Sequence, residues 1–283
     1  MSETKAPILV IGGTGKTGRR VVERLHTRGV PVRIGTRSSD PPFDWLDSST
    51  WAPAVQGVKA AYVTYYPDTA FSGAGEQVRA FAESAVANGV RHLVFLSGRN
   101  EPAAQRAEAA IQESGADWTI VRSAFFAQDF NEAFFVEDIL NGELAFPAGD
   151  TAEPFIDVDD IADVVTAALT DERHKNQLYE VTGPRLLTFA DAVAEISEAT
   201  GRRITYVPIS ADEFRSALAE TGMPTEEVEE FVDLFTTILD GRSQYLTDGV
   251  HRALGREPRD FRDFARDAAA TGVWNAPVPE RQP

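Results

Sequence analysis

The chain of 283 residues contains no cysteine. Disulfides, thiolate catalysis and cysteine-bound zinc are therefore excluded, and the composition suits the cytoplasm, where thiols stay reduced. The four histidines are scattered and form no H-E-x-x-H pair, so we expect no metal site. No serine stands in a G-x-S-x-G motif, which argues against an α/β-hydrolase.

Long apolar runs and an excess of basic charge are also lacking. No run approaches the roughly 20 residues of a membrane-spanning helix, and Met1 to Ala6 shows no signal-peptide pattern. The formal net charge is −17, which argues against nucleic-acid binding because phosphate contacts need a basic face. We therefore expect a cytoplasmic protein that binds a small molecule, and neither nucleic acid nor a membrane.

The stretch ILVIGGTGKTGRR, residues 8–20, combines features of two phosphate-binding motifs. A P-loop would need its first glycine at position 10, which is Val10. The dinucleotide-binding spacing is complete instead, because Gly13, Gly15 and Gly18 form G-x-G-x-x-G and Gly12 extends the pattern.

The surroundings of this motif support the dinucleotide interpretation over an ordinary turn without a ligand. The apolar residues 7–11 predict a buried strand, and residues 16–28 predict a helix that ends at Gly29. Backbone N–H groups and the positive helix end would then meet a pyrophosphate. The predicted cofactor-binding residues of this turn are Gly12, Gly13, Thr14, Gly15, Lys16, Thr17 and Gly18.

Strand and helix patterns alternate through the first half of the chain. The predicted strands are 30–36, 58–65, 91–97 and 118–122, and the predicted helices between them are 76–88 and 102–113. This order predicts an α/β fold, a Rossmann-type doubly wound parallel sheet with helices on both faces. Ligands of such sheets lie at the carboxyl ends of the strands.

The second half predicts a smaller, mostly helical C-terminal part. Its helices are expected at 159–169, 188–200, 211–220, 225–239 and 261–270, with short strands at 179–182 and 204–208. We place a dinucleotide-binding domain at 1–150 and a substrate-binding part at 151–283, interleaved with the first. Asp157, Asp159 and Asp160 stand where a helix begins, and we expect them to favour its dipole rather than bind a metal.

Five segments carry a family resemblance. They are GGTGKTG at 12–18, ESGADWTIVRSAFFAQDF at 113–130, FIDVDDIADV at 155–164, YEVTGP at 179–184 and LGREPRDFRDFARD at 254–267. In this order they resemble the NmrA-like group of atypical short-chain dehydrogenase/reductases. The resemblance implies a Rossmann domain, NADP(H) as the ligand, and either reductase activity or a redox-sensing regulatory role.

The end of the second predicted strand bears on which dinucleotide is bound. Arg37 and Ser38 follow it, and no acid occurs before Asp40. An acid would bind a free ribose 2′-hydroxyl, whereas an arginine suits a 2′-phosphate. We therefore predict NADP(H), the alternative being that Arg37 is only a solvated surface residue.

The resemblance also implies contacts farther along the cofactor. It places Asp44 and Trp45 beside the adenine, and Thr64, Tyr65 and Tyr66 along the pyrophosphate and nicotinamide ribose. The last three residues stand at the carboxyl end of the third predicted strand, which agrees with the rule that ligands lie at strand carboxyl ends. The alternative for Tyr65 and Tyr66 is that they only pack under a loop.

A group of phenylalanines after the fifth predicted strand has two interpretations: Phe125, Phe126, Phe130, Phe134 and Phe135. It lines an apolar substrate pocket, for which Phe125, Phe126 and Phe130 are the candidates, or it forms the core between the two parts. We favour a reductase that transfers hydride from NADPH to a small apolar acceptor of the quinone, enone, imine or carbonyl type. The alternative is a non-catalytic regulator that binds NADP(H) and a protein partner.

The sequence contains no obvious proton donor. None of the six tyrosines begins the Tyr-x-x-x-Lys motif of typical short-chain dehydrogenases. Ala104 stands where the resemblance implies a lysine or histidine, four residues before Glu108. Ser97 ends the fourth predicted strand and is the catalytic candidate, expected to hydrogen-bond the acceptor or the nicotinamide, or else to cap the turn that follows. Neither the acceptor nor the oligomeric state follows from the sequence.

Overall fold

The computed structural model describes residues 6–275. Met1–Lys5, on which the expectation of no signal peptide depends, lie outside the described residues. The chain forms two compact units. Unit 1 comprises Met1–Ala124, Val158–Thr182 and Thr247–Pro258, and unit 2 comprises Phe125–Asp157, Gly183–Leu246 and Arg259–Pro283. The boundary expected near residue 150 falls within the first segment of unit 2.

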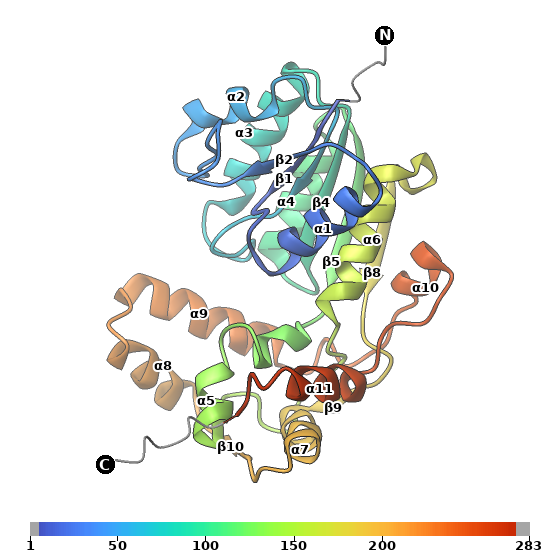
Figure 1. Ribbon diagram of the computed structural model, residues 1–283. Coiled ribbons are helices and arrows are strands. Elements are labelled where there is room, and N and C mark those ends of the chain that lie inside the picture. Colours follow the sequence, from blue (N-terminus) through green and yellow to red (C-terminus); the bar gives the residue numbers. More distant parts are fainter. Residues whose placement is uncertain (1–5, 276–283) are drawn as a thin grey trace, which may run out of the picture. The chain divides into compact units, whose positions relative to one another are not determined.

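Unit 1 is built on a six-stranded sheet in the order β2-β1-β3-β4-β5-β8, with every neighbouring pair parallel (Figure 1). The strands are β1 Ile8–Ile11, β2 Val32–Gly35, β3 Ala60–Val63, β4 His92–Gly98, β5 Asp117–Ser123 and β8 Gln177–Val181. The apolar residues of β1 are buried throughout, and so are most of those of β3, β4 and β5, as a parallel sheet covered by helices requires, whereas Val32 and Ile34 of the edge strand β2 are half-buried. The predicted Rossmann-type sheet is confirmed.

Helices cover both faces of this sheet. On one face α1 (Lys16–Thr27) packs against α6 (Val158–Thr170), and on the other α3 (Ala74–Ala87) packs against α4 (Pro102–Gln112). The short α2 (Trp51–Val55) follows η1 (Ser48–Thr50) and contacts α3. The short η3 (Glu172–His174) follows α6. Much later in the chain, α10 (Gly249–Leu254) returns to unit 1 and packs against β8 and α6. The pattern of residues 16–28 did predict α1, which buries Val21, Val22 and Leu25.

Unit 2 has two small sheets and a layer of helices. In the sheets β6 (Glu143–Phe146) pairs in parallel with β10 (Thr205–Pro208), and β7 (Ala152–Glu153) pairs antiparallel with β9 (Leu187–Thr188). The helices are η2 Ala127–Phe130, α5 Val136–Asn141, α7 Phe189–Thr200, α8 Ala211–Glu220, α9 Thr225–Ile238 and α11 Phe261–Ala270. The sequence predicted the longer ones but not η2 or α5, because one or two turns show too little periodicity.

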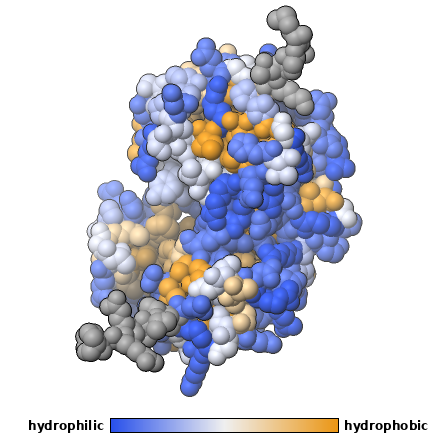
Figure 2. All heavy atoms as spheres, viewed as in Figure 1, coloured by the Kyte–Doolittle hydropathy of each residue, from blue (hydrophilic) through white to orange (hydrophobic). Residues whose placement is uncertain are grey.

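A dense aromatic core holds unit 2 together. Phe146 contacts Phe135 and Phe189 with ring centroids 4.9 and 5.1 Å apart, and the Trp274 indole donates to the Phe130 carbonyl at 2.8 Å. Figure 2 shows that the visible surface is mainly hydrophilic, with apolar residues gathered in small patches. No helix between residues 6 and 275 combines the length and apolar composition that crossing a membrane requires.

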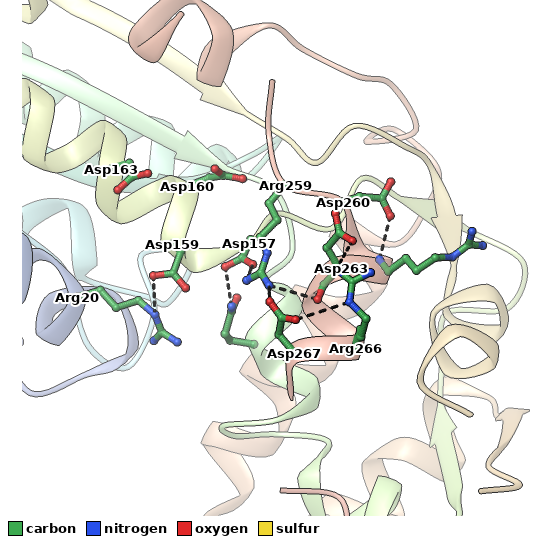
Figure 3. Close-up of polar contacts among 12 residues, drawn as sticks. Arg20, Asp157, Asp159, Asp160, Asp163, Arg259, Asp260, Asp263, Arg266 and Asp267 are labelled. Carbon is green, nitrogen blue, oxygen red and sulfur yellow. Dashed lines mark hydrogen bonds and ion pairs between the residues drawn. The ribbon is translucent and has the colours of Figure 1, made fainter. Parts of the chain in front are cut away.

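The acids at 157–160 are neutralised by arginines. Asp159 accepts from Arg24 at 2.8 Å in unit 1, where it also lies 3.3 Å from Arg20. In unit 2, Figure 3 shows Arg259 reaching both Asp157 and Asp267, at 2.8 and 2.5 Å. Asp159 and Asp160 occupy the first turn of α6, in keeping with the expected dipole contribution. Within residues 6–275 no three histidines or acids are grouped so as to hold a metal ion.

Candidate cofactor and active site

The glycine turn after β1 is shaped so that side chains are excluded. Gly12 has φ +66°, and the Gly15 N–H donates to the Gly12 carbonyl at 2.8 Å. A Cβ at Gly18 would lie 2.1 Å from that carbonyl oxygen, and one at Gly13 would lie 2.9 Å from Ile34 Cγ2. The backbone can therefore approach a ligand closely here, and only glycine leaves the room.

The N-terminus of α1 is left open by this turn. Gly15 is its N-cap and provides no side-chain hydrogen bond, and the first turn of the helix contains no acid. The N–H groups of the first helical turn and the positive end of the dipole therefore suit an anion. Thr14 and Gly15 are exposed and Lys16 is half-buried. Thr17 is turned inward, where its Oγ1 accepts from the Tyr62 hydroxyl at 3.0 Å.

Arg37 and Ser38 lie directly after β2, both exposed. Among residues 6–275 the Arg37 side chain has no hydrogen-bond or ion-pair partner. Ser39 shapes this turn from inside, since its Oγ lies 2.8 and 2.9 Å from the carbonyl oxygens of Thr36 and Pro41 and can donate its hydrogen to either. The guanidinium of Arg37 thus projects from an ordered turn at the carboxyl edge of the sheet without being committed to another residue.

The loop that follows holds the expected adenine neighbours. Trp45 is 8% exposed and packs against Phe43 and Phe81, with centroids 5.2 and 5.3 Å apart. Its Nε1 donates to the carbonyl of Thr64 at 3.0 Å, which joins this loop to the end of β3. Leu46, which the sequence analysis did not single out, is the exposed apolar side chain of the loop, at 86%.

The residues after β3 lie against the glycine turn. Thr64 Oγ1 donates to the Ile11 carbonyl at 3.1 Å, and it would lie 2.8 Å from a Cβ at Gly12. The structure therefore brings Thr64 and Gly12 into contact although they are far apart in the sequence. Tyr65 is half-buried, and its hydroxyl donates to Gln77 Oε1 at 3.0 Å. Tyr66 is 77% exposed.

Ser97 belongs to a buried polar network at the carboxyl ends of β4, β5 and β8. Its Oγ donates to Glu108 Oε1 at 2.6 Å, and Arg122 binds both oxygens of the same carboxylate at 2.9 and 2.5 Å. Arg122 also lies 3.5 Å from Glu180, which Arg99 binds at 2.9 Å. Hydrogen bonding to Glu108 raises the pKa of Arg122. The network fixes the Ser97 hydroxyl in one orientation.

Sequence reasoning missed three members of this network, Arg99, Arg122 and Glu180. A signal was present, because Arg122 interrupts the apolar run of a predicted strand and a charge in such a run requires a buried partner. The identity of that partner was not deducible, since Glu108 and Glu180 reach Arg122 only through the strand order of the folded sheet.

The phenylalanine group divides between the two interpretations. Phe130 and Phe135 are completely buried and belong to the core of unit 2 itself. The pocket interpretation does not extend to Phe130, because η2 turns its ring inward and neighbouring rings enclose it. Phe125 and Phe126 are half-buried, and Phe134 is 40% exposed. Phe125 stacks at 13° on Phe135, with centroids 6.1 Å apart.

The model of a protein family described as NAD(P)H-binding matches residues 12–172. The chain belongs to this NAD(P)H-binding family. It is 32% identical over 282 residues to the uncharacterized oxidoreductase YesF of Bacillus subtilis (strain 168), with 95% of this chain and 98% of the relative covered. It is 31% identical over 288 residues to the NAD(P)H azoreductase of Xenophilus azovorans, with 93% and 98% covered.

Solved structures agree on the fold. The NADPH-dependent quinone oxidoreductase QOR2 of Escherichia coli, complexed with NADPH, superposes with a TM-score of 0.77 at 20% identity, covering 92% of this chain and 99% of that chain. NmrA, a negative transcriptional regulator in complex with NAD, gives 0.71 at 15% identity, covering 96% and 97%. The predicted NmrA-like resemblance is confirmed. The family match makes the chain NAD(P)H-binding, and the two relatives, which it matches along nearly their whole length, are named as an oxidoreductase and an azoreductase.

Proposed function

We propose that the protein is an NADPH-dependent reductase of a small apolar acceptor of the quinone, enone, imine or carbonyl type. The observation that carries the cofactor assignment is the uncommitted guanidinium of Arg37, which follows β2 beside a glycine turn that no side chain fills. A fork of two N–H donors on a 2′-phosphate is worth more than a contact with a hydroxyl. NADPH is therefore preferred over NADH.

The cofactor would lie along the carboxyl edge of the sheet. Backbone N–H groups of the glycine turn and of the first turn of α1, other than that of Gly15, bind its pyrophosphate, with Lys16 adding charge. Arg37 and Ser38 bind the 2′-phosphate. At the adenine, Asp44 and exposed Leu46 supply the contacts, and Trp45 acts by anchoring their loop to Thr64. Thr64, Tyr65 and Tyr66 border the pyrophosphate and the nicotinamide ribose.

At the nicotinamide end, Ser97 orients the cofactor or the acceptor and does not donate a proton to it. Its hydrogen is donated to Glu108, so its lone pairs remain as acceptors for a donor such as the carboxamide N–H₂. The bound cofactor supplies a hydride, and the protein holds donor and acceptor in position, which can account for much of the rate.

The acceptor class rests on two supports. Phe125 and Phe126 are half-buried aromatic residues that come shortly after β5, so their rings are partly accessible to a planar apolar compound. The reductases to which the chain is similar are named for azo compounds and quinones, which are planar electron acceptors. A cytoplasmic location stays a prediction from the absence of cysteine.

Two measurements test this function. Titration of NADPH and NADH by fluorescence compares their affinities, and equal values would contradict the assignment of Arg37. NADPH consumption is then followed over a panel of quinones, enones, imines, aldehydes and azo dyes. Tight NADPH binding without turnover of any member would contradict the acceptor class and favour a regulator that reports NADP(H) to a protein partner.

A further inference from the structure

Glu101 lies just beyond β4, at the edge of the sheet where ligands of this fold bind. It occupies the N-cap position of α4 with extended backbone angles, φ −100° and ψ 106°, yet its side chain makes no capping hydrogen bond. The carboxyl group folds back onto the chain instead. A Cβ at Gly98 would lie 2.0 Å from its Oε1 and 2.2 Å from its Cδ. The carboxyl therefore rests against the backbone of the residue after Ser97.

This carboxyl group is enclosed but not satisfied. Its Oε2 is buried and has no hydrogen-bond partner among the residues that the structure describes, 6–275. Burial raises the pKa of Glu101 well above its usual range, and the charges of Asp68 and Glu108 raise it further. The cations of this region are committed elsewhere, since Arg122 binds Glu108 and Arg99 binds Glu180.

A structural role does not account for these contacts. Glu101 does not cap α4 with its side chain, as a residue at the N-cap position often does. A buried acid that serves stability is expected to be paired with a cation. Glu108 is such an acid, held by Ser97 and Arg122 a few residues away. Two neighbouring carboxyl groups in opposite environments, one paired and one alone, form the pattern that separates a charged group from a proton donor in active sites.

We propose that Glu101 is the proton donor of the reduction, the role that no tyrosine of this chain fills. This inference rests on the reductase function proposed above. The acceptor takes two electrons and a hydrogen as hydride from the reduced nicotinamide, which is oxidised. The O–H bond of Glu101 breaks as its proton bonds to the oxygen, nitrogen or carbon of the acceptor where negative charge develops. The carboxylate that remains is reprotonated by water, so each turnover consumes one proton.

The kinetic test compares acceptors with and without a need for a proton. A neutral quinone or enone needs one, whereas a cationic triarylmethane dye becomes neutral on taking hydride and does not. Glu101→Gln should lower kcat for the neutral acceptor by about a hundredfold or more, since general acid catalysis is worth that order. It should leave the cationic dye and the NADPH affinity nearly unchanged. Glu113→Gln is the matched control, because Glu113 follows the same helix and only pairs with Arg79 on the surface.

A second readout needs no turnover. Infrared spectra of the wild-type protein and of each variant are compared at pH 7 without cofactor. The wild-type protein should show the C=O stretch of a neutral carboxylic acid, which should be lost in Glu101→Gln and retained in Glu113→Gln. Glu101→Met, neutral and of similar length, replaces the glutamine variant in both tests if that variant does not fold.

The outcomes separate the two proposals. If the wild-type protein reduces a neutral acceptor and Glu101→Gln reduces it equally well, Glu101 is not the donor and the reductase function stands. An absent neutral-acid band in the wild-type protein also overturns the donor. If the wild-type protein reduces neither acceptor while binding NADPH, the proposed function itself is overturned, and the donor with it.

Discussion

Ser97 and Glu108 are joined by a 2.6 Å hydrogen bond in which the serine hydroxyl is the donor. Because Arg122 grips both oxygens of Glu108, the carboxylate is held in place and the serine proton is directed at it. Under the proposed function, Ser97 would therefore meet a ligand as a hydrogen-bond acceptor, and its hydroxyl would orient the ligand rather than protonate it. The proton has to come from elsewhere.

Replacement of Ser97 by alanine should have a modest effect. One neutral hydrogen bond to the ligand is worth about 1 kcal/mol, so we expect kcat/KM to fall by about fivefold. Steady-state kinetics with NADPH and a quinone measure this. A fall of about a thousandfold, the range of a lost general acid, would show that Ser97 takes part in proton transfer.

Phenylalanine substitutions at Tyr65 and Tyr66 should be tolerated. The Tyr65 hydroxyl is committed to Gln77, and Tyr66 is an exposed side chain. We expect turnover within about tenfold of the wild-type value for each variant, far less than the range of general acid catalysis. Single-turnover rates at saturating NADPH provide the measurement. A variant that binds NADPH normally but loses activity by about a thousandfold would refute the view that no tyrosine is the donor.

Arg37→Ala should weaken NADPH binding selectively. A charge-assisted bond to phosphate contributes about 2 kcal/mol, so the Kd for NADPH should rise by about thirtyfold while that for NADH stays the same. Calorimetric titration of both cofactors distinguishes these effects. Arg91→Ala is the control, since this exposed arginine precedes β4 at the opposite edge of the sheet. Equal losses for both cofactors would mean that Arg37 does not contact the 2′-phosphate.

Gly18→Ala should damage the cofactor turn. The new methyl would lie 2.1 Å from the Gly12 carbonyl oxygen, a backbone atom that cannot move without opening the turn. We expect a loss of stability of about 2 kcal/mol or more, as for an overpacked core, together with loss of NADPH binding. Gly75→Ala is the matched control, because its methyl would meet its nearest atom at 3.5 Å. Thermal unfolding with and without NADPH reports both effects.

His92 should make the fold sensitive to acid. Thr119 donates its single hydroxyl proton to the His174 carbonyl, so it accepts from His92, and the Nε2 atom of His92 therefore carries a hydrogen. Burial lowers the pKa of His92 to about 4, and the charge of Lys175 adds to this. The unfolded chain, with a histidine pKa of about 6.5, binds the proton first.

The sign of the pH dependence follows from this difference. The contribution of His92 to the free energy of unfolding should be complete above pH about 6.5. It should decline as the pH falls toward 4, by at most about 3 kcal/mol. Urea unfolding between pH 7 and 4 measures the decline. His92→Gln should flatten the curve, whereas His26→Gln, at an exposed histidine, should leave it unchanged. An unaltered slope in His92→Gln would contradict the assignment.

Local pattern was sufficient for much of the fold. The apolar strand at 7–11, the glycine spacing and the helix at 16–28 are all written within a short stretch of chain, because strand burial, a side-chain-free turn and an amphipathic helix each depend on residues next to one another. The alternation of such units implied the parallel sheet, and the position of Arg37 after a strand placed it at the ligand edge. Short elements such as α5 lacked enough periodicity to be recognised.

The partners of individual side chains were decided only by the tertiary structure. Nothing near Trp45 in the sequence shows that its indole turns inward to the Thr64 carbonyl. Nor does the sequence around Phe130 show that rings from distant segments enclose it. Glu101 has the position of a helix cap, yet its carboxyl group lies beside Gly98, where Oε2 is buried with no hydrogen-bond partner among residues 6–275. Burial and charge depend on strands and helices brought together from distant parts of the chain, so the sequence determined where the cofactor edge lies, and only the folded sheet determined which of its acids is left unpaired.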